Sequence, residues 1–567
     1  MAENILILSM TRMGDMIQTT PLIRGLKEKY PESKITLLVT SDFASAVPLI
    51  PNVDDSIVLD FKQFDISANW EDQSWIKVYR YLEESLENIK GRDYDLLVNL
   101  SHSKFSALMV RYLGIKNVIG FHCNAFGDRI TGHPWMQYFG VEVFNRTYNE
   151  FNLVEIFSGS AGIDVKGRSI EVLRPQNQSS LDTLLPANCE ELLIGFQAGS
   201  SLEGRRWSAQ SFANLADMLI EKTNARILIF GVQSENKVAE DVISLARNKD
   251  RISNFAGKTS LDELSQLLEK CEYLVTNDTG TMHLAAALGT KIVGLFFAHA
   301  HPYETAPFFP GHLIFQAGIS CAPCSYGVHC NNIVCVEKVR PQHLCSAIEG
   351  HIKTRTWKLP ETITPDSEVN VFETAIGFDM NFRLRPLVRR GLAVNDLLRS
   401  AYGVLWRASL DDKKEGNDYL GLCEDLAREY DCSDVETLAE QLKYSILDDI
   451  SKLAHAGQRL CGKIIKGGSG RNSRKIGRFG EDITNVDKEI EVLGFSNPEV
   501  KPLTDMFSKR KENVGGDNIC LLAIETRKCY IDLINECEKL QEILKGCVGK
   551  LSGYISHNSI NVAVPGR

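Results

Sequence analysis

The most informative stretch of the chain is residues 276–283, which read Thr-Asn-Asp-Thr-Gly-Thr-Met-His. An apolar run precedes it and another follows, so we expect a strand, a turn with Asp278, Thr279 and Gly280, and then a helix. The start of a helix has unpaired N–H groups and partial positive charge, and glycine lets a phosphate approach the backbone. The pattern predicts either an anion site with His283 one helical turn inside it, or an ordinary N-cap.

Two carboxylates occupy similar junctions between strand and helix. Asp15 follows Gly14 after the apolar segment 4–8. A carboxylate at the end of a strand, facing a cleft, suits a general base, although it also serves to start a helix. Glu235 follows the strand candidate 226–230 and suits a ribose diol, or simply belongs to a turn.

Hydroxyls and cations follow another strand candidate, residues 192–196. Ser200 and Ser201 come first, and Arg205 and Arg206 follow a few residues later. This composition suits a diphosphate, because a guanidinium makes planar two-point contacts with phosphate oxygens. The alternative is a solvated basic turn.

Length and composition describe an ordinary globular protein with more than one domain. The chain has 567 residues, 44% hydrophobic and 24% charged, which predicts two to four domains. Its net charge of −10 gives no support to nucleic-acid binding. We find no apolar run of 18 residues and no secretory leader, so a cytoplasmic protein is expected, with the inner face of the membrane as an alternative location.

The elements alternate between strand and helix over the first 350 residues. This alternation predicts a doubly wound α/β sheet in each of two halves, with ligands at the carboxyl ends of the strands. The expected domains are a first Rossmann-like half at 1–175, a second at 188–355 and a mainly α-helical domain at 380–567. A single helix is expected over 16–30 and a flexible basic loop over 463–480.

Taken together, the four junctions resemble glycosyltransferase family 9, the bacterial heptosyltransferases. The Asp-Thr-Gly-x-x-His motif at 278–283, the Gly-Asp opening at 14–15 and the hydroxyl, cation and Trp segment at 198–207 carry the resemblance. It covers about residues 4–345 and implies a GT-B fold. It also implies an inverting transfer from ADP-heptose to an acceptor, without a catalytic metal.

The resemblance also implies a role for each junction. Asp15 would be the general base from the first, acceptor-binding half. The second half would hold the donor, with Arg205 at a position where the family often has Lys and with Arg206 as its alternative. The implied donor-binding residues are Ser200, Ser201, Arg206, Glu235, Asp278, Thr279, Gly280 and His283; a helix-packing role for His283 stays open.

A cluster of cysteines lies near the end of the second half. Cys321, Cys324, Cys330 and Cys335 are spaced C-x2-C-x5-C-x4-C, which can close a tetrahedral zinc or iron site. Four unrelated thiols in a loop are the alternative, and His329 is a substitute ligand. Resemblance to autotransporter heptosyltransferases implies a structural iron finger here.

The helical tail has no catalytic motif. Its basic stretches, 383–390 and 463–478, suit either an anionic lipid surface, hence a peripheral membrane contact, or a plain solvated face. The tail itself suits acceptor docking or homo-oligomer formation. Three functions follow: transfer of heptose to lipopolysaccharide core, glycosylation of a protein hydroxyl with this or another nucleotide sugar, or a non-catalytic nucleotide-binding scaffold. The acceptor would accordingly be a glycan, a lipid or a protein.

Overall fold

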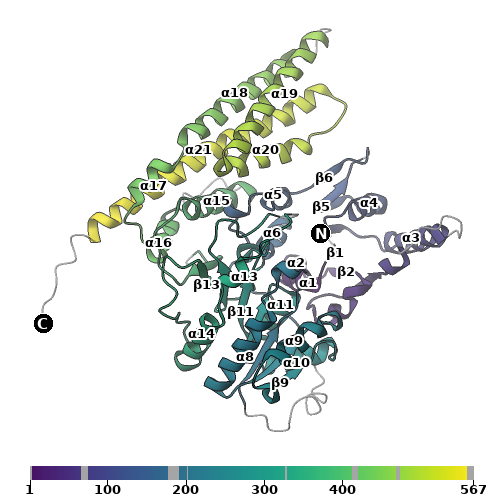
Figure 1. The fold of residues 1–567 in the computed structure, drawn as a ribbon. Coiled ribbons are helices and arrows are strands. Elements are labelled where there is room, and N and C mark those ends of the chain that lie inside the picture. The colour runs from purple at the N-terminus through teal and green to yellow at the C-terminus, as the bar shows by residue number, and fades with distance from the viewer. Residues whose placement is uncertain are drawn as a thin grey trace. The chain divides into compact units, whose positions relative to one another are not determined.

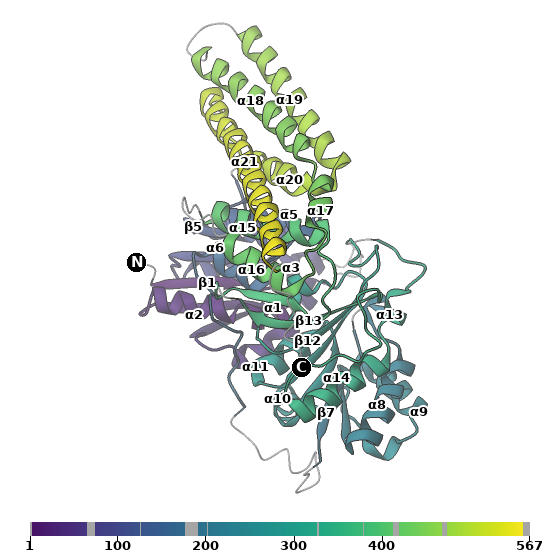
Figure 2. The same ribbon diagram turned by 90° about the vertical axis from the view of Figure 1, so that its left-hand side faces the viewer.

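The computed structural model describes residues 3–64, 74–124, 126–175, 191–200, 202–325, 328–377, 379–411, 419–467 and 473–558. The chain forms two units, which Figures 1 and 2 show in two views. The first comprises residues 1–129 and 152–388, and the second residues 130–151 and 389–567. The second unit therefore includes a short segment that interrupts the first unit in sequence.

The first sheet has β1 at its centre, in the order β3-β2-β1-β4-β5-β6. β1 pairs in parallel with both β2 and β4, which places Leu8 beside Leu38 and Asn99. Leu6 and Leu8 are completely buried, as expected for a parallel strand covered on both faces. The strands are β1 (Asn4–Leu8), β2 (Lys34–Thr40), β3 (Asp55–Leu59), β4 (Leu96–Asn99), β5 (Asn117–Cys123) and β6 (Arg129–Thr131).

The helix expected over 16–30 is two helices, α1 (Met13–Gln18) and α2 (Thr20–Lys29). Pro21 in the first turn of α2 has no N–H to donate, so a helix continuing through it would leave a carbonyl of α1 unpaired. Threonine hydroxyls bond these carbonyls instead: Thr19 Oγ1 donates to Met16 O at 2.6 Å and Thr20 Oγ1 to Ile17 O at 2.8 Å. The short helix α1 can therefore end, and its first turn stays at the end of β1.

Up to residue 175, the first unit has three further α-helices among its described residues. They are α3 (Ser74–Lys90), α4 (Lys104–Leu113) and α6 (Leu153–Ser160).

The second sheet follows the order β14-β13-β12-β11-β10-β7-β8-β9. Pairing is parallel from β12 through β9, and β10 lies beside β7, with Thr276 opposite Gln197. The parallel strands are β7 (Leu193–Gln197), β8 (Arg226–Phe230), β9 (Ile252–Asn254), β10 (Tyr273–Asn277), β11 (Lys291–Phe296) and β12 (Leu313–Ala317). Their helices are α8 (Ala209–Thr223), α9 (Asn236–Leu245), α10 (Leu261–Lys270), α11 (Gly280–Leu288), α12 (Pro302–Thr305), α13 (Cys335–Lys338) and α14 (Pro341–Thr354).

This sheet continues beyond residue 355, where the sequence suggested that the second half ends. The hairpin of β13 (Val369–Ile376) and β14 (Phe382–Pro386) adds two antiparallel strands at its edge. Val369 and Val371 of β13 are buried within the apolar core of this half, so the hairpin belongs to it. The helical part of the chain therefore begins after this hairpin.

The second unit is helical. In α18 the buried residues Leu447, Ile450, Ala454, Gly457, Cys461 and Ile464 recur at three- and four-residue intervals, the spacing of a packed helical seam. A Cβ at Gly457 would overlap the ring of Tyr530 on α21, so glycine permits the close approach of these helices. Its helices are α5 (Pro134–Glu142), α15 (Val394–Leu410), α16 (Tyr419–Glu429), α17 (Val435–Gln441), α18 (Tyr444–Gly467), α19 (Ser473–Ser496), α20 (Lys501–Glu512) and α21 (Ile519–Asn558).

The prediction of a flexible loop over 463–480 is wrong for most of that segment. α18 continues to Gly467 and α19 starts at Ser473, while residues 468–472 lie outside the described part of the chain. Ile464 is buried and Lys463 lies 5.5 Å from the ring of Phe479, so the apolar seam carries the helix through the basic residues. Among the described helices, none is both long and apolar enough to cross a membrane.

A buried ion pair holds α20 to α21. Arg510 donates to both carboxylate oxygens of Glu536, at 2.9 and 2.6 Å, and Ser409 of α15 donates to the same carboxylate at 2.6 Å. The two charged side chains are 12% and 4% exposed. We expect Glu536→Ala to lower the free energy of unfolding by about 3–5 kcal/mol, because Arg510 is left buried without its counter-charge. Urea unfolding checks this, with the exposed pair variant Lys452→Ala as control; equal midpoints would contradict it.

Candidate active site

The predicted junctions of the second half meet at the carboxyl ends of three neighbouring strands. Gln197, the last residue of β7, lies opposite Phe230 of β8 on one side and Thr276 of β10 on the other. The turns that follow these strands therefore begin side by side, as expected for a ligand site in an open α/β sheet.

The turn after β10 carries an arginine–aspartate pair. Arg205 forms an ion pair with the Asp278 carboxylate, and its Nη2 donates to Asp278 O at 3.1 Å. Both side chains are nearly buried, at 9% and 10% exposure. Thr279 is the N-cap residue, and α11 starts at Gly280. The positive charge and the start of α11 thus lie on the same turn.

The first turns of α1 and α11 touch through two glycines. A Cβ at Gly14 would lie 3.2 Å from Gly280 Cα and 3.1 Å from His283 Cδ2, and a Cβ at Gly280 would lie 3.2 Å from Gly14 N. Both positions lie within the first unit. Asp15 is therefore brought from the first sheet to the helix start that carries Asp278.

Burial and a neighbouring carboxylate raise the pKa of Asp15 above its ordinary 3.8. Loss of hydration is the larger cause, and the negative charge of Asp278 adds to it. Hydrogen bonds from Arg12 N, at 3.2 Å, and from Thr11 oppose the rise. A carboxylate held in this way is a stronger base than an exposed one.

His283 is neutral at physiological pH. Burial lowers its pKa to about 4, and the charge of Asp278 only partly opposes this. The edge of its ring faces Gly14, while Nδ1 is buried without a hydrogen-bond partner. His283 therefore packs against the first turn of α1 and still has one ring nitrogen without a hydrogen-bond partner.

Several other buried polar atoms around these turns have no hydrogen-bond partner. They are Ser200 Oγ, Arg205 Nε and Arg206 Nε. Arg206 Nη2 donates to Ser200 O at 2.9 Å, so the two residues flank the same loop. Buried groups of this kind are normally satisfied, and their concentration in one place points to a ligand rich in acceptor oxygens. Ser201 lies outside the described residues.

Glu235 ends a short turn after β8, and a buried glutamine fixes its carboxylate. Oε2 accepts from Gln197 Nε2 and from Val232 N, both at 3.0 Å. A Cβ at Gly199 would overlap this carboxylate, so the turn after β7 must carry glycine there. Gln197 Oε1 in turn accepts from Thr281 of α11 at 3.2 Å, which links the Glu235 turn to the α11 turn.

Sequence reasoning missed the role of Asn277. This fully buried residue donates through Nδ2 to Ala198 O at 3.0 Å and Gly199 O at 3.2 Å, and its Oδ1 accepts from Trp207 N at 3.0 Å. One amide therefore holds both ends of the loop between β7 and Trp207. The available signal was a polar residue ending an otherwise apolar strand.

The four cysteines do not assemble into a metal site in the described residues. Cys321 and Cys330 are exposed, Cys324 is half-buried and Cys335 is buried. Within the described part of the chain, no three His, Cys, Asp or Glu side chains are grouped so as to hold a metal ion. The Cys335 thiol has its pKa raised by burial. The iron or zinc site stays a prediction from spacing, and so does the substitute ligand His329.

The first basic stretch of the tail is largely paired. Arg383 pairs with Asp379 at 2.9 Å, Arg385 pairs with Glu373, and Arg390 pairs with Asp396 at 3.1 Å. These charges are neutralised locally, which favours the structural interpretation over a membrane-binding one for residues 383–390.

Two doubly wound sheets, with polar groups gathered at the carboxyl ends of their strands, form a GT-B-like fold. The glycosyltransferase family 9 (heptosyltransferase) model matches residues 84–332. The chain is 27% identical over 327 residues to lipooligosaccharide heptosyltransferase 2 of Haemophilus ducreyi, covering 53% of this chain and 85% of that protein. It is 25% identical over 312 residues to lipopolysaccharide heptosyltransferase 3 of Escherichia coli, covering 54% and 85%.

The solved structures agree on the fold. A glycosyl transferase family 9 protein of Veillonella parvula superimposes with a TM-score of 0.50 at 20% identity, over 61% of this chain and 96% of that one. Over residues 84–332 the chain is thus similar to glycosyltransferase family 9 (heptosyltransferase), and it shares the fold of that family.

Proposed function

We propose that the protein transfers heptose from ADP-heptose to an acceptor hydroxyl with inversion at the anomeric carbon. The observation that carries this proposal is the group of buried, unpartnered donors around the start of α11, next to an aspartate from the opposite sheet. The names of the relatives, all heptosyltransferases, support the choice of heptose. A non-catalytic scaffold would have no need for a base with a raised pKa at this place.

The donor diphosphate would lie on the α11 turn and the loop after β7. Arg205, Ser200 and Arg206 would contact its oxygens together with the backbone N–H groups of Thr279 and Gly280. His283, being neutral, would donate a hydrogen bond rather than a charge. Asp278 would bind the sugar hydroxyls.

The reaction needs one base and one stabilised leaving group. Asp15 would take the proton of the acceptor hydroxyl, and the oxygen would form a bond to the anomeric carbon from the side opposite the diphosphate. The bond between that carbon and the diphosphate oxygen breaks, and ADP leaves with the electron pair. Arg205 and the helix start would stabilise its charge, so the proposal uses no catalytic metal.

Lipopolysaccharide core is the first acceptor to test, because the curated relatives act in its assembly by name. A protein hydroxyl is the second candidate, because the larger part of the helical unit, residues 389–567, lies beyond the matched family segment. A structural iron or zinc at the four cysteines is a separate proposal, tested by metal analysis of wild type and of Cys321→Ser/Cys324→Ser.

The test uses the full-length protein with ADP-heptose, ADP-glucose or UDP-glucose, and with heptose-deficient lipopolysaccharide or candidate proteins as acceptors. We expect a mass gain of one heptose on one acceptor class, from ADP-heptose alone. A gain from UDP-glucose instead would overturn the donor assignment, and no gain on any acceptor would favour the scaffold.

Gln197 provides a test of the nucleotide half. Glu235 would bind the ribose, and Gln197 holds its carboxylate at 3.0 Å. We expect Gln197→Ala to weaken ADP binding about tenfold, roughly the worth of one hydrogen bond to a charged group. Calorimetric titration with ADP measures this. Gln210→Ala is the matched control, because that amide bonds Asn214 on the exposed face of α8; equal affinities in the two variants would contradict the role.

A further inference from the structure

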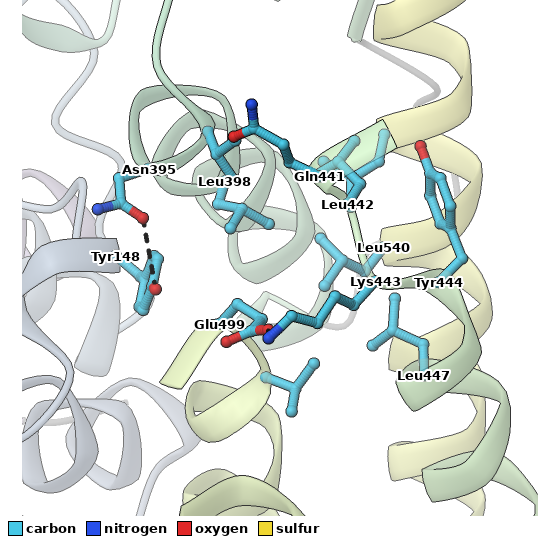
Figure 3. A pocket seen from close by; sticks show the side chains of 13 residues that line it. Tyr148, Asn395, Leu398, Gln441, Leu442, Lys443, Tyr444, Leu447, Glu499 and Leu540 are labelled. Carbon is cyan, nitrogen blue, oxygen red and sulfur yellow. Dashed lines mark hydrogen bonds and ion pairs between the residues drawn. The ribbon is translucent and has the colours of Figure 1, made fainter. Parts of the chain in front are cut away.

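A cavity of about 210 Å³ lies in the helical unit, and Figure 3 shows its lining. Its walls come from the segment before Phe151, from α15, α18 and α21, and from the junction of α17 and α18. Sites for drug-sized ligands usually measure roughly 300–1,000 Å³, so this cavity suits a smaller molecule.

The floor of the cavity is aliphatic. Its residues are each at most 8% exposed, and they are Leu398, Leu442, Leu447, Val500, Leu540 and Leu544. Such a surface favours a short hydrocarbon chain, because each buried methylene contributes about 0.8 kcal/mol.

An ion pair and two tyrosines line the same cavity. Lys443 extends toward Glu499, with Nζ 2.5 Å from Oε1 (Figure 3). The two partners differ in exposure: the lysine side chain is 54% exposed and the glutamate side chain only 19%. Burial and the charge of Glu499 raise the pKa of Tyr148 to about 12, so this ring stays neutral beside the carboxylate.

The glutamate is held through its backbone, and the lysine is the more exposed partner of the pair. Glu499 O accepts from Tyr402 Oη at 2.7 Å, and Tyr402 is buried. Lys443 lies in the break between α17 and α18, where the chain is not helical. If a ligand replaces one member of the pair, the exposed lysine can return to water at low cost, whereas the half-buried glutamate cannot.

We propose that this cavity binds a primary alkylammonium group, with its hydrocarbon chain on the leucine floor and its ammonium on Glu499 in place of Lys443. Tyr148 and Tyr444 also line the cavity, and the ring of Tyr444 already has Lys545 Nζ at 5.3 Å from its centroid. The same chemistry belongs to free alkylamines and diamines and to the side chain of a lysine in a polypeptide. The site is separate from the proposed transferase centre and does not depend on it.

Calorimetric titration of the full-length protein tests the proposal. The probes are n-hexylamine, 1,5-diaminopentane, hexanoate, hexanol and a short blocked peptide with one lysine. We expect the amines to bind and hexanoate and hexanol to bind at least tenfold more weakly. Binding of the peptide as well would assign the site to a polypeptide, and binding of the free amines alone would assign it to a small molecule. Hexanoate or hexanol binding as tightly as hexylamine would overturn the proposal.

Two variants sharpen the test. Glu499→Gln should weaken hexylamine about tenfold or more, and Lys443→Met should strengthen it several-fold, because the competing internal cation is removed. Lys452→Met is the control for the second variant, since Lys452 pairs with Asp449 on the outer face of α18. Weaker binding in Lys443→Met would contradict the displacement of the lysine, even if Glu499→Gln failed to fold.

Discussion

Asp15→Asn is expected to lower kcat/KM by about 10²–10⁴-fold, the usual contribution of a positioned general base. The amide keeps the size of the side chain and can still accept from Arg12 N, but it cannot take a proton. ADP release from ADP-heptose with a working acceptor measures the effect. Asp164→Asn is the matched control, because this exposed aspartate accepts a local hydrogen bond from Lys166 N, at 3.0 Å.

The same substitution has a predicted effect on stability that a merely structural aspartate would not show. The pKa of Asp15 is raised in the folded protein, so the unfolded chain loses this proton at lower pH. Folding stability therefore falls as pH rises from 3.8 through the folded-state pKa, and the cost remains at neutral pH. Asp15→Asn should thus unfold at a higher temperature than wild type at pH 7. An inactive variant that unfolds at a lower temperature would contradict this account of its burial.

The acid limb of the pH profile gives a second measurement on Asp15. Activity requires the deprotonated carboxylate, so kcat/KM should rise with pH through a pKa above the ordinary 3.8. Asp278→Asn removes a negative charge that contributes to the shift, and its acid limb should move to lower pH. If the acid limb of the Asp278→Asn profile did not move, the Asp15 and Asp278 carboxylates would not interact.

Arg205→Ala is expected to lower kcat by about 10²–10³-fold, comparable to the loss of one donor to a transition-state oxyanion. The leaving diphosphate gains charge, and Arg205 is a buried cation with a free Nε beside the start of α11. The variant also leaves Asp278 nearly buried without its partner, so weaker donor binding should accompany the loss. Steady-state kinetics with varied ADP-heptose separate these two effects.

Three other arginine variants are compared with Arg205→Ala, and the last of them is the control. Arg205→Lys should retain part of the activity, because the charge remains while the planar fork is lost. Arg206→Ala should lose less than Arg205→Ala, since Arg205 is paired with Asp278 on the turn that starts α11, whereas Arg206 donates to Ser200 O on the loop after β7. Arg251→Ala removes an arginine that pairs with Glu191 at 2.5 Å, outside the site, and should match wild type. A larger loss of activity in Arg206→Ala than in Arg205→Ala would mean that Arg206, and not Arg205, stabilises the leaving diphosphate.

The parts of the site that follow strands could be predicted because their signals are local. An apolar run, a glycine and a polar residue at 273–280 indicate a strand, a turn and a helix start without any knowledge of distant residues. Parallel pairing then places such turns at one edge of a sheet. The fold class was predictable for the same reason, because alternation of strand and helix is visible along the chain.

The parts that could not be predicted depend on contacts between distant residues. Gln197 reaches Glu235 and Thr281, and Asn277 reaches Gly199, through amides that look ordinary in sequence. The approach of Gly14 to Gly280 joins two separate sheets, so no local pattern announces it. The continuation of α18 through basic residues similarly depends on its packing against α21, with Gly457 beside Tyr530.

The most direct test is the release of ADP from ADP-heptose by the purified protein with heptose-deficient lipopolysaccharide or a candidate protein acceptor. The account predicts ADP release that depends on the acceptor, with one heptose gained by the acceptor for each ADP, and its loss in Asp15→Asn. Release by Asp15→Asn at the wild-type rate would contradict the central claim that an aspartate from the first sheet acts on a donor held by the second.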